Sequence, residues 1–216
     1  MIRSLLRLLP ALLLVLLPAA PFHAPALIPP TGMQAPAPSL DATLPSLAAF
    51  VEQVRTGTGT HITGIYAAEV FAYPVVQQPA GQAGFVSSLA DTLTQFGMAS
   101  TYGSLGFLAH NTLAGSAFSE VELYQLITVV YGDGLTTTYQ VMDIRRFEAT
   151  LPTSPYSSFV DLETNKTLTA ADLFAQTYGI RGTLVLQTCI SRNGMDSWGR
   201  LFLIAVPYFP DHPTYH

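Results

Sequence analysis

From His61 to Pro207 the chain alternates between short β-branched or aromatic segments and turns that contain glycine or proline. The clearest case is the pair Leu126 to Tyr131 and Thr136 to Ile144, which flanks Gly132-Asp133-Gly134, a sequence typical of a β-hairpin turn. Short strands interrupted this regularly favour a mainly β fold, organised as a closed or nearly closed barrel. Further strands are expected at residues 62–76 with a break at Pro74, 103–110, 183–188 and 201–206.

Two short helices interrupt the strand pattern. The first has Ser46 as its N-cap, carries a single apolar stripe and ends at Gly57. The second has Thr169 as its N-cap, Asp172 three residues later to complete a capping box, and Gly179 as its stop. We therefore expect two or three short helices packed on the barrel.

Residues 1–26 predict a secretory signal peptide. Arg3 and Arg7 precede a leucine-rich run, and Ala24-Pro25-Ala26 offers small residues at a cleavage site after Ala26. The run is shorter than the ~20 apolar residues that span a bilayer comfortably. The alternative is an N-terminal anchor that is retained and associates the protein with the membrane. Either way, we expect a secreted or extracytoplasmic protein.

Residues 27–45 are rich in proline and alanine and predict an extended linker, so that residues 46–216 form one domain. Only 11% of the chain is charged and the formal net charge is −5. Arg145 and Arg146 form the only adjacent basic pair. Such a chain cannot neutralise a run of phosphates, so we expect no nucleic-acid partner.

Cys189 is the only cysteine, and in an exported protein it cannot form an internal disulfide. It follows the apolar segment 183–188, and Arg200 opens the next strand after a polar loop at residues 190–199. Two adjacent strands joined by a loop would place Cys189 and Arg200 side by side at one rim of the barrel. His110 ends an earlier apolar strand, again at a rim.

A thiol, an imidazole and a guanidinium at strand ends suit thiol-dependent acyl transfer. The thiolate of Cys189 is the nucleophile, and the imidazole of His110 supplies a proton to the leaving amine. Arg200 stays protonated and is suited to stabilise the developing oxyanion. Arg192 is the rival for this role, ranked second because it lies in the polar loop. The alternatives are a buried inert cysteine, a structural histidine and an arginine in an ion pair.

The same segments resemble the signature segments of the sortases. Leu186 to Cys189 is similar to the sortase signature Thr-Leu-x-Thr-Cys, with Val185 in place of its first threonine. Ala109 to Asn111, followed by Phe118, resembles the sortase segment in which a strand ends in histidine. The segment from Trp198 to Phe202 resembles the last sortase strand with its arginine. The order His, Cys, Arg along the chain also matches.

The resemblance runs from about Thr63 to Pro207 and implies a sortase-like eight-stranded β-barrel. It implies a catalytic site of Cys189, His110 and Arg200. It also implies cleavage of a sorting-signal peptide through a thioacyl-enzyme, which an amine resolves.

Three further residues are candidates for substrate contact. Thr188 could direct its hydroxyl and backbone at the oxyanion, or be an ordinary strand residue. Asn111 could orient His110 or merely end the strand, and Trp198 is a packing residue or a wall of the substrate groove. The histidines and acidic residues show no spacing that gathers metal ligands, so we expect no metal and no cofactor.

The leading functional hypothesis is an exported cysteine transpeptidase. Its partners would be a peptide or protein that carries a sorting signal, and a primary amine on a cell-wall precursor or a protein lysine. The first alternative is a secreted cysteine peptidase in which water resolves the acyl-enzyme. The second is a non-catalytic β-barrel that serves as a binding module.

Overall fold

The computed structural model describes residues 44–154 and 156–210. The predicted signal peptide and all but the last two residues of the predicted linker lie outside the described residues. The helices are α1 (Leu47–Val54), α2 (Gly97–Tyr102), the 3-10 helix η2 (Ala114–Glu120) and α3 (Ala170–Tyr178). The strands are β1 (Ile62–Ala67), β2 (Phe71–Gln77), β3 (Leu93–Gln95), β4 (Leu105–Leu108), β5 (Leu126–Tyr131), β6 (Thr136–Ala149), β7 (Phe159–Asp161), β8 (Thr167–Leu168), β9 (Leu184–Arg192) and β10 (Met195–Pro207).

Eight of these strands close into a barrel. They follow one another in the order β10-β9-β4-β3-β2-β1-β5-β6, and a pairing between β10 and β6 closes the ring. The β2–β3 and β4–β9 pairs are parallel and the other pairs are antiparallel. Strands β7 and β8 extend the sheet from β6, beyond the ring. The predicted mainly β fold with an eight-stranded barrel is therefore confirmed.

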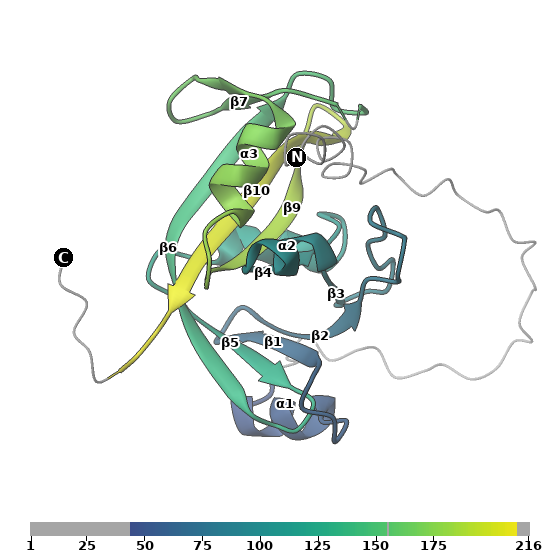
Figure 1. Ribbon diagram of the computed structural model, residues 1–216, viewed down its shortest axis with the longest axis vertical. Helices are drawn as coiled ribbons and strands as arrows, with labels where there is room; N and C mark the ends of the chain where they lie inside the picture. Colours follow the sequence, from purple (N-terminus) through teal and green to yellow (C-terminus); the bar gives the residue numbers. More distant parts are fainter. Residues whose placement is uncertain (1–43, 155, 211–216) are drawn as a thin grey trace, which may run out of the picture.

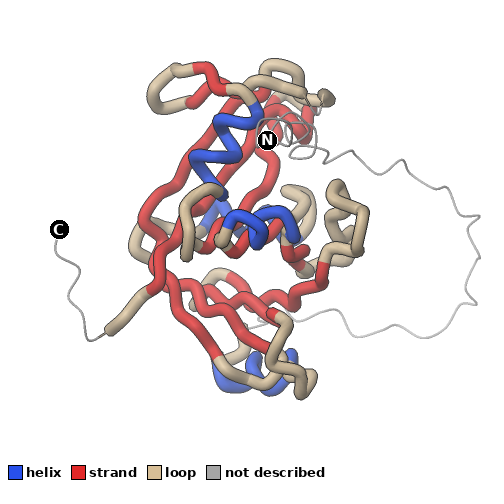
Figure 2. Tube along the Cα trace, in the orientation of Figure 1, coloured by secondary structure: helices blue, strands red, loops and turns tan. Residues whose placement is uncertain are grey.

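The barrel wall separates two apolar clusters, as the alternation of side chains along a strand requires. In β9, Leu184 and Leu186 belong to a cluster inside the barrel. Val185 belongs to a second cluster outside it, which includes Leu173 and Phe174 of α3. Figure 1 shows α2 and α3 beside β4, β9 and β10, with α1 at the opposite end against β1 and β5. Figure 2 shows these helices on the outer side of the strands.

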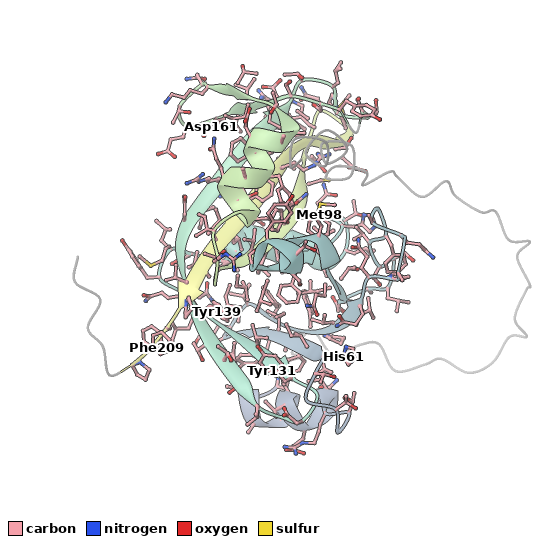
Figure 3. All side chains as sticks on the ribbon, viewed as in Figure 1. His61, Met98, Tyr131, Tyr139, Asp161 and Phe209 are labelled. Carbon is pink, nitrogen blue, oxygen red and sulfur yellow. The ribbon has the colours of Figure 1, made fainter. Side chains whose placement is uncertain are left out.

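Strand β6 spans the length of the molecule. It pairs with β5 near its start and with β7 near its end. Figure 3 places Asp161 of β7 at one end of the molecule and His61 and Tyr131 at the other, beside α1. The segment from Tyr139 to Glu148 pairs with β10 and so closes the barrel behind the site described below.

The predicted strand region 62–76 is two strands rather than one interrupted strand. β1 and β2 form an antiparallel hairpin, in which Gly64 pairs with Pro74. Pro74 does not break β2, because it lies where the pairing of β2 changes from β1 to β3, whose partners begin at Val75. Because a proline has no N–H to donate to a neighbouring strand, it is tolerated best where regular pairing is interrupted.

The predicted polar loop 190–199 is also corrected. β9 continues to Arg192 and β10 begins at Met195, so the connection is a tight hairpin at Asn193 and Gly194. Both residues have positive φ, 51° and 79°, as expected for an Asn-Gly two-residue turn. Cys189 therefore lies within its strand rather than at its tip.

The predicted helices are observed as α1 and α3, although α1 ends at Val54, before the predicted stop at Gly57. The Ser46 hydroxyl accepts a hydrogen bond from the Ala49 N–H at 3.3 Å, and Thr169 and Asp172 form the predicted capping box. A third α-helix, α2, precedes β4. Within the described part of the chain, no helix has the length and apolarity needed to cross a membrane.

Candidate active site

Cys189 and Arg200 are direct partners across the β9–β10 pair. Paired residues of an antiparallel sheet project to the same face, so their side chains lie on the same side of the barrel wall. The thiol and the guanidinium interact electrostatically. The expected adjacency of these two residues is thus observed, although a long antiparallel pair positions them rather than a loop.

The strand that leads to His110 lies on the opposite side of β9 from Arg200. The parallel β4–β9 pair runs from Leu105 opposite Leu184 to Leu108 opposite Gln187. Continued by two residues, this register sets His110 beside Cys189 and on the same face. The backbone supports the continuation, because the Ala109 N–H still donates to the Gln187 carbonyl at 3.2 Å. Cys189 therefore lies between the strand that leads to His110 and the strand that carries Arg200.

The hydroxyl of Thr188 holds the histidine segment against β9. It donates to the Ala109 carbonyl at 2.9 Å and is almost fully buried. This internal partner occupies the hydroxyl proton, so the structure does not support the prediction that the hydroxyl faces an oxyanion. Thr188 instead fixes the residue immediately before His110.

The segment after His110 is equally tightly packed. The N–H groups of Leu113 and Gly115 both donate to the His110 carbonyl at 2.9 Å. A Cβ at Gly115 would clash with the Thr188 hydroxyl and lie 2.8 Å from the His110 carbonyl oxygen. Only glycine leaves room for this approach of η2 to β9, which sets the direction of the chain as it leaves His110.

Arg200 is a buried cation, with 1% of its surface exposed. Its Nη1 donates to the carbonyls of Ser197 and Gly199 at 2.9 and 2.8 Å, and its guanidinium lies 5.9 Å from the ring centre of Phe159. Its Nε is buried and has no hydrogen-bond partner among the described residues. A buried, unsatisfied donor is costly, and it can donate a hydrogen bond to a ligand oxygen without first giving up another partner.

Burial sets the protonation of the two reacting groups. It raises the pKa of the Cys189 thiol above its ordinary value, an effect that Arg200 opposes and Asp196 reinforces. Burial lowers the pKa of His110, and a hydrogen bond with the Val86 backbone opposes this effect. That bond raises the pKa, so the imidazolium is its donor and Val86 its acceptor. The resting pair is therefore a neutral thiol and a neutral imidazole.

A cavity of about 320 Å³ adjoins the cysteine. Thr188, Cys189, Ile190 and Ser191 of β9 contribute to its wall. The remaining lining residues come from the segment after β4, from β6 and from β10, namely Asn111, Gly115, Ser116, Ser119, Arg146 and Leu201. A larger cavity, of about 660 Å³, lies between β6, β7, β8 and α3, and neither Cys189 nor His110 lines it.

Asn111 connects the histidine segment to the β9–β10 hairpin. Its Nδ2 donates to the Ser191 hydroxyl at 2.6 Å and to the Asp196 carbonyl at 3.0 Å. Ser191 in turn donates to the Asp196 carboxylate at 3.0 Å. Both amide protons of Asn111 are thus used to anchor the segment rather than to orient the His110 ring directly.

Trp198 and Arg192 pack on each other near the hairpin turn. The Arg192 guanidinium lies 4.7 Å from the centre of the Trp198 ring, within cation–π range. Arg192 is exposed, whereas Arg200 is buried and is the arginine that interacts electrostatically with Cys189. The predicted contact of Trp198 with a substrate stays a prediction, because Trp198 does not line the cavity at Cys189.

Sequence reasoning missed the residues that hold the site together. Each of the predicted residues has a neighbour that positions it but whose residue type gives no signal in the sequence. These neighbours are Gly115, Ser191, Asp196 and Val86. The Asn193-Gly194 pair was the available signal, because it marks a hairpin turn and would have extended β9 past Cys189. Among the described residues, no three His, Cys, Asp or Glu side chains gather in a way that could hold a metal ion.

No protein-family profile matches the chain, and no curated protein matches its sequence significantly. Similar solved structures include sortase A of Listeria monocytogenes, with a TM-score of 0.43 and 11% identity over 68% of this chain and 87% of that one. Sortase C1 of Streptococcus suis gives 0.44 and 15% over 79% and 82%. Sortase C-1 of Actinomyces oris gives 0.44 and 13% over 68% and 72%.

At such low identities and TM-scores, these likenesses do not by themselves establish an activity. The case for a function rests on the geometry around Cys189. The expected fold, a mainly β chain with a closed eight-stranded barrel, is the fold observed.

Proposed function

We propose that this chain is an exported cysteine transpeptidase of the sortase type, with Cys189 as its nucleophile. One observation carries the proposal: β9 sets Cys189 directly opposite Arg200 on one side, and its register with β4 leads to His110 on the other. A thiol flanked by an imidazole and a buried guanidinium is the arrangement that acyl transfer needs.

In the first half-reaction, His110 takes the proton of the Cys189 thiol, and the thiolate attacks the carbonyl carbon of a peptide bond. The developing oxyanion is stabilised by Arg200, whose buried Nε is free of other partners among the described residues. The C–N bond then breaks, and His110 returns its proton to the leaving amine. The product is a thioester between Cys189 and the acyl half of the peptide.

In the second half-reaction, an amine attacks the thioester carbonyl. His110 accepts a proton from the attacking nitrogen, and Arg200 again stabilises the oxyanion. The C–S bond breaks and the Cys189 thiol is regenerated with the proton from His110. No redox change occurs, and the chemistry needs no metal or cofactor.

The substrate side of the proposal follows the sequence resemblance. The acyl donor is a peptide or protein that carries a sorting-signal-like motif, and the acceptor is a primary amine of a cell-wall precursor or a protein lysine. The protein works outside the cytoplasm, after export directed by residues 1–26. A retained N-terminal segment would add a membrane association.

Product analysis distinguishes transpeptidation from its alternatives. The protein is incubated with a library of sorting-signal-like peptides, with and without an added primary amine, and the products are identified by mass. A new amide formed with the amine supports the transpeptidase. Acid products alone, at any amine concentration, would replace it by a cysteine peptidase. Absence of cleavage together with ordinary thiol reactivity would favour a binding module.

A further inference from the structure

The loop between β2 and β3, residues 78–92, reaches His110 through its backbone. Leu108 belongs to the outer apolar cluster and Ala109 to the inner one, so the continued alternation directs His110 to the outer face of the barrel wall. Val86 of the loop packs against the same outer cluster. Its carbonyl is the hydrogen-bond acceptor of the imidazole.

Cys189 and Arg200 share this outer face. Arg200 pairs with Phe147 of β6, which is a member of the outer cluster, and Cys189 pairs with Arg200. Residues that are direct partners in neighbouring strands project to the same face of a sheet. The loop and the proposed reacting groups therefore lie on one side of the wall.

One peptide group connects the histidine to Thr94 of β3. The N–H of Ser87 donates to the Thr94 hydroxyl at 2.8 Å, and this N–H belongs to the same planar peptide group as the Val86 carbonyl. The described residues contain no cis peptide bond, so the N–H and the carbonyl of this group point in opposite directions. Holding the N–H on Thr94 therefore fixes the direction of the carbonyl that His110 contacts.

Thr94 is a firm anchor for this peptide group. It is fully buried, and its backbone pairs with that of Leu108 in the β3–β4 pair. Leu108 pairs in turn with Gln187 of β9, two residues before Cys189. The anchor, the strand that leads to His110 and the strand of the nucleophile thus belong to one continuous hydrogen-bonded sheet.

A second tether holds the other peptide group of Val86. The Gln78 Nε2 donates to the carbonyls of Ala83 and Phe85 at 2.8 and 3.1 Å. The Gln78 Oε1 accepts from the Gly97 N–H, at the start of α2, at 3.2 Å. Because Phe85 directly precedes Val86, both peptide groups that flank the Val86 side chain have an anchored atom. The Val86 carbonyl cannot turn without the loss of one of these bonds.

A fixed carbonyl beside a neutral imidazole selects its tautomer. The ring nitrogen that faces Val86 keeps the proton, because only an N–H can donate to a carbonyl. The other nitrogen then has a free lone pair and can accept the proton of the Cys189 thiol. In the opposite tautomer an N–H would face the thiol and could not act as a base. The direction of this carbonyl thus decides whether His110 can activate Cys189.

No charged side chain of the described residues takes the place of this carbonyl. Burial and the Val86 carbonyl are the two influences on the pKa of His110. Asp91, the only ionisable residue of the loop, interacts with Tyr73 of β2. Helix α2 carries no charged residue, and η2 carries one, Glu120, which is exposed. The charged groups of the β9–β10 hairpin that act on the pKa of Cys189 are Arg200 and Asp196.

We propose that the peptide group between Val86 and Ser87 fixes the tautomer and orientation of His110, and that Thr94 is the positioning residue that holds this group. The consequence for catalysis rests on the proposed transpeptidase function. The tautomer itself does not, because the free protein has it before any substrate binds. The two parts can therefore fail separately, and the tests measure them separately.

The first test determines the tautomer of His110 from long-range proton–nitrogen correlation spectra of the isotope-labelled protein, at a pH above the pKa of His110 and without substrate. The chain has five histidines, and the His110 signals are identified by their absence in His110→Gln. Wild type should show one tautomer. Thr94→Val keeps the side-chain shape but removes the acceptor of the Ser87 N–H, so it should show both tautomers. Thr94→Ser, which retains the hydroxyl, should restore one.

The same spectra, recorded as a pH titration, give the pKa of His110. The hydrogen bond to Val86 raises this pKa, so a weaker bond in Thr94→Val should lower it. A rise would show that the loop only shields the ring from water, and would overturn the assignment.

The second test measures the rate of thioacyl-enzyme formation from the best donor peptide. Thr94→Val should lower kcat/KM about fivefold, the scale of one ordinary hydrogen bond, and Thr94→Ser should recover most of the loss. Thr92→Val is the matched control. Thr92 is also buried, but its hydroxyl donates to the Ala90 carbonyl at 2.9 Å. Its replacement should change neither the tautomer of His110 nor the rate.

If Thr94→Val does not fold, Gln78→Met tests the same carbonyl through the second tether, with the exposed Gln82→Met as its control. Gln78→Met should also show both tautomers. A single, unchanged tautomer in whichever of these two variants folds would overturn the assignment. If Thr94→Val mixed the tautomers but wild type formed no thioacyl-enzyme, the transpeptidase would be wrong while the positioning role stood.

Discussion

Cys189 and Arg200 face each other as direct partners in the antiparallel β9–β10 pair, so backbone hydrogen bonds fix the proposed nucleophile relative to the proposed oxyanion-stabilising cation. The two strands continue beyond them to a tight turn at Asn193 and Gly194. A pair set in the middle of a hairpin is more rigid than one at the tips of two strands. This rigidity is what a preorganised electrostatic site requires.

Arg200→Ala should lower the rate of peptide cleavage by a factor on the order of 10²–10³, the scale for losing one oxyanion donor. The rate is measured with the best peptide of a sorting-signal-like library and normalised to the folded fraction, because Arg200 is buried. Arg192→Ala is the matched control and should keep the wild-type rate. The reverse pattern would transfer the role to Arg192.

The pH dependence of kcat/KM should be a broad bell. Burial lowers the pKa of His110 and raises the pKa of Cys189. Between the two pKa values, the thiolate–imidazolium form is therefore a small, constant fraction of the enzyme. Below the pKa of His110 the thiolate is lost, and above the pKa of Cys189 the imidazolium is lost. The acid limb should lie below the ordinary pKa of histidine and the alkaline limb above that of cysteine. An acid limb above the ordinary histidine pKa would contradict this.

Thr188→Val should loosen the His110 segment while preserving the shape of the side chain. It removes the 2.9 Å hydrogen bond to the Ala109 carbonyl and should lower the free energy of unfolding by about 1–3 kcal/mol. The acid limb of the kcat/KM profile should also move toward the ordinary histidine pKa, as His110 gains solvent. Thr128→Val, in β5 and away from the site, should move neither the limb nor the rate. An unchanged acid limb in Thr188→Val would mean that the bond is only structural.

Gly115→Ala should displace η2 from β9. The added Cβ would meet the Thr188 hydroxyl and the His110 carbonyl, and such overpacking costs about 1–3 kcal/mol. Both thermal stability and cleavage rate should fall. Gly97→Ala makes only an ordinary contact with Gln78, at 3.7 Å, and serves as the control. Equal effects of the two substitutions would show that the approach at Gly115 has no special role.

Much of the fold could be predicted from local sequence signals. The Gly132-Asp133-Gly134 hairpin, the Ser46 cap and the capping box of Thr169 and Asp172 each depend on a few neighbouring residues, and all are observed. The extension of β9 through Ser191 was missed because polar, exposed residues form it. Only its pairing with β10 stabilises it as a strand.

The site could be predicted only in part. Residue type and order indicated Cys189, His110 and Arg200 as candidates, because few side chains perform this chemistry. The register between β4 and β9 depends on packing across the barrel and has no local signal. For the same reason the sequence could not show which face of β6 Arg145 and Arg146 each occupy.

Intact-mass spectrometry can detect the proposed thioacyl-enzyme on Cys189 without any assumption about the accepting amine. Wild type and Cys189→Ala are incubated with a mixture of sorting-signal-like peptides, with and without hydroxylamine. We expect a peptide-sized mass increase on wild type alone, which hydroxylamine discharges as the hydroxamate. A wild-type mass that never changes, in a folded protein whose Cys189 alkylates no faster than an ordinary buried thiol, would contradict it.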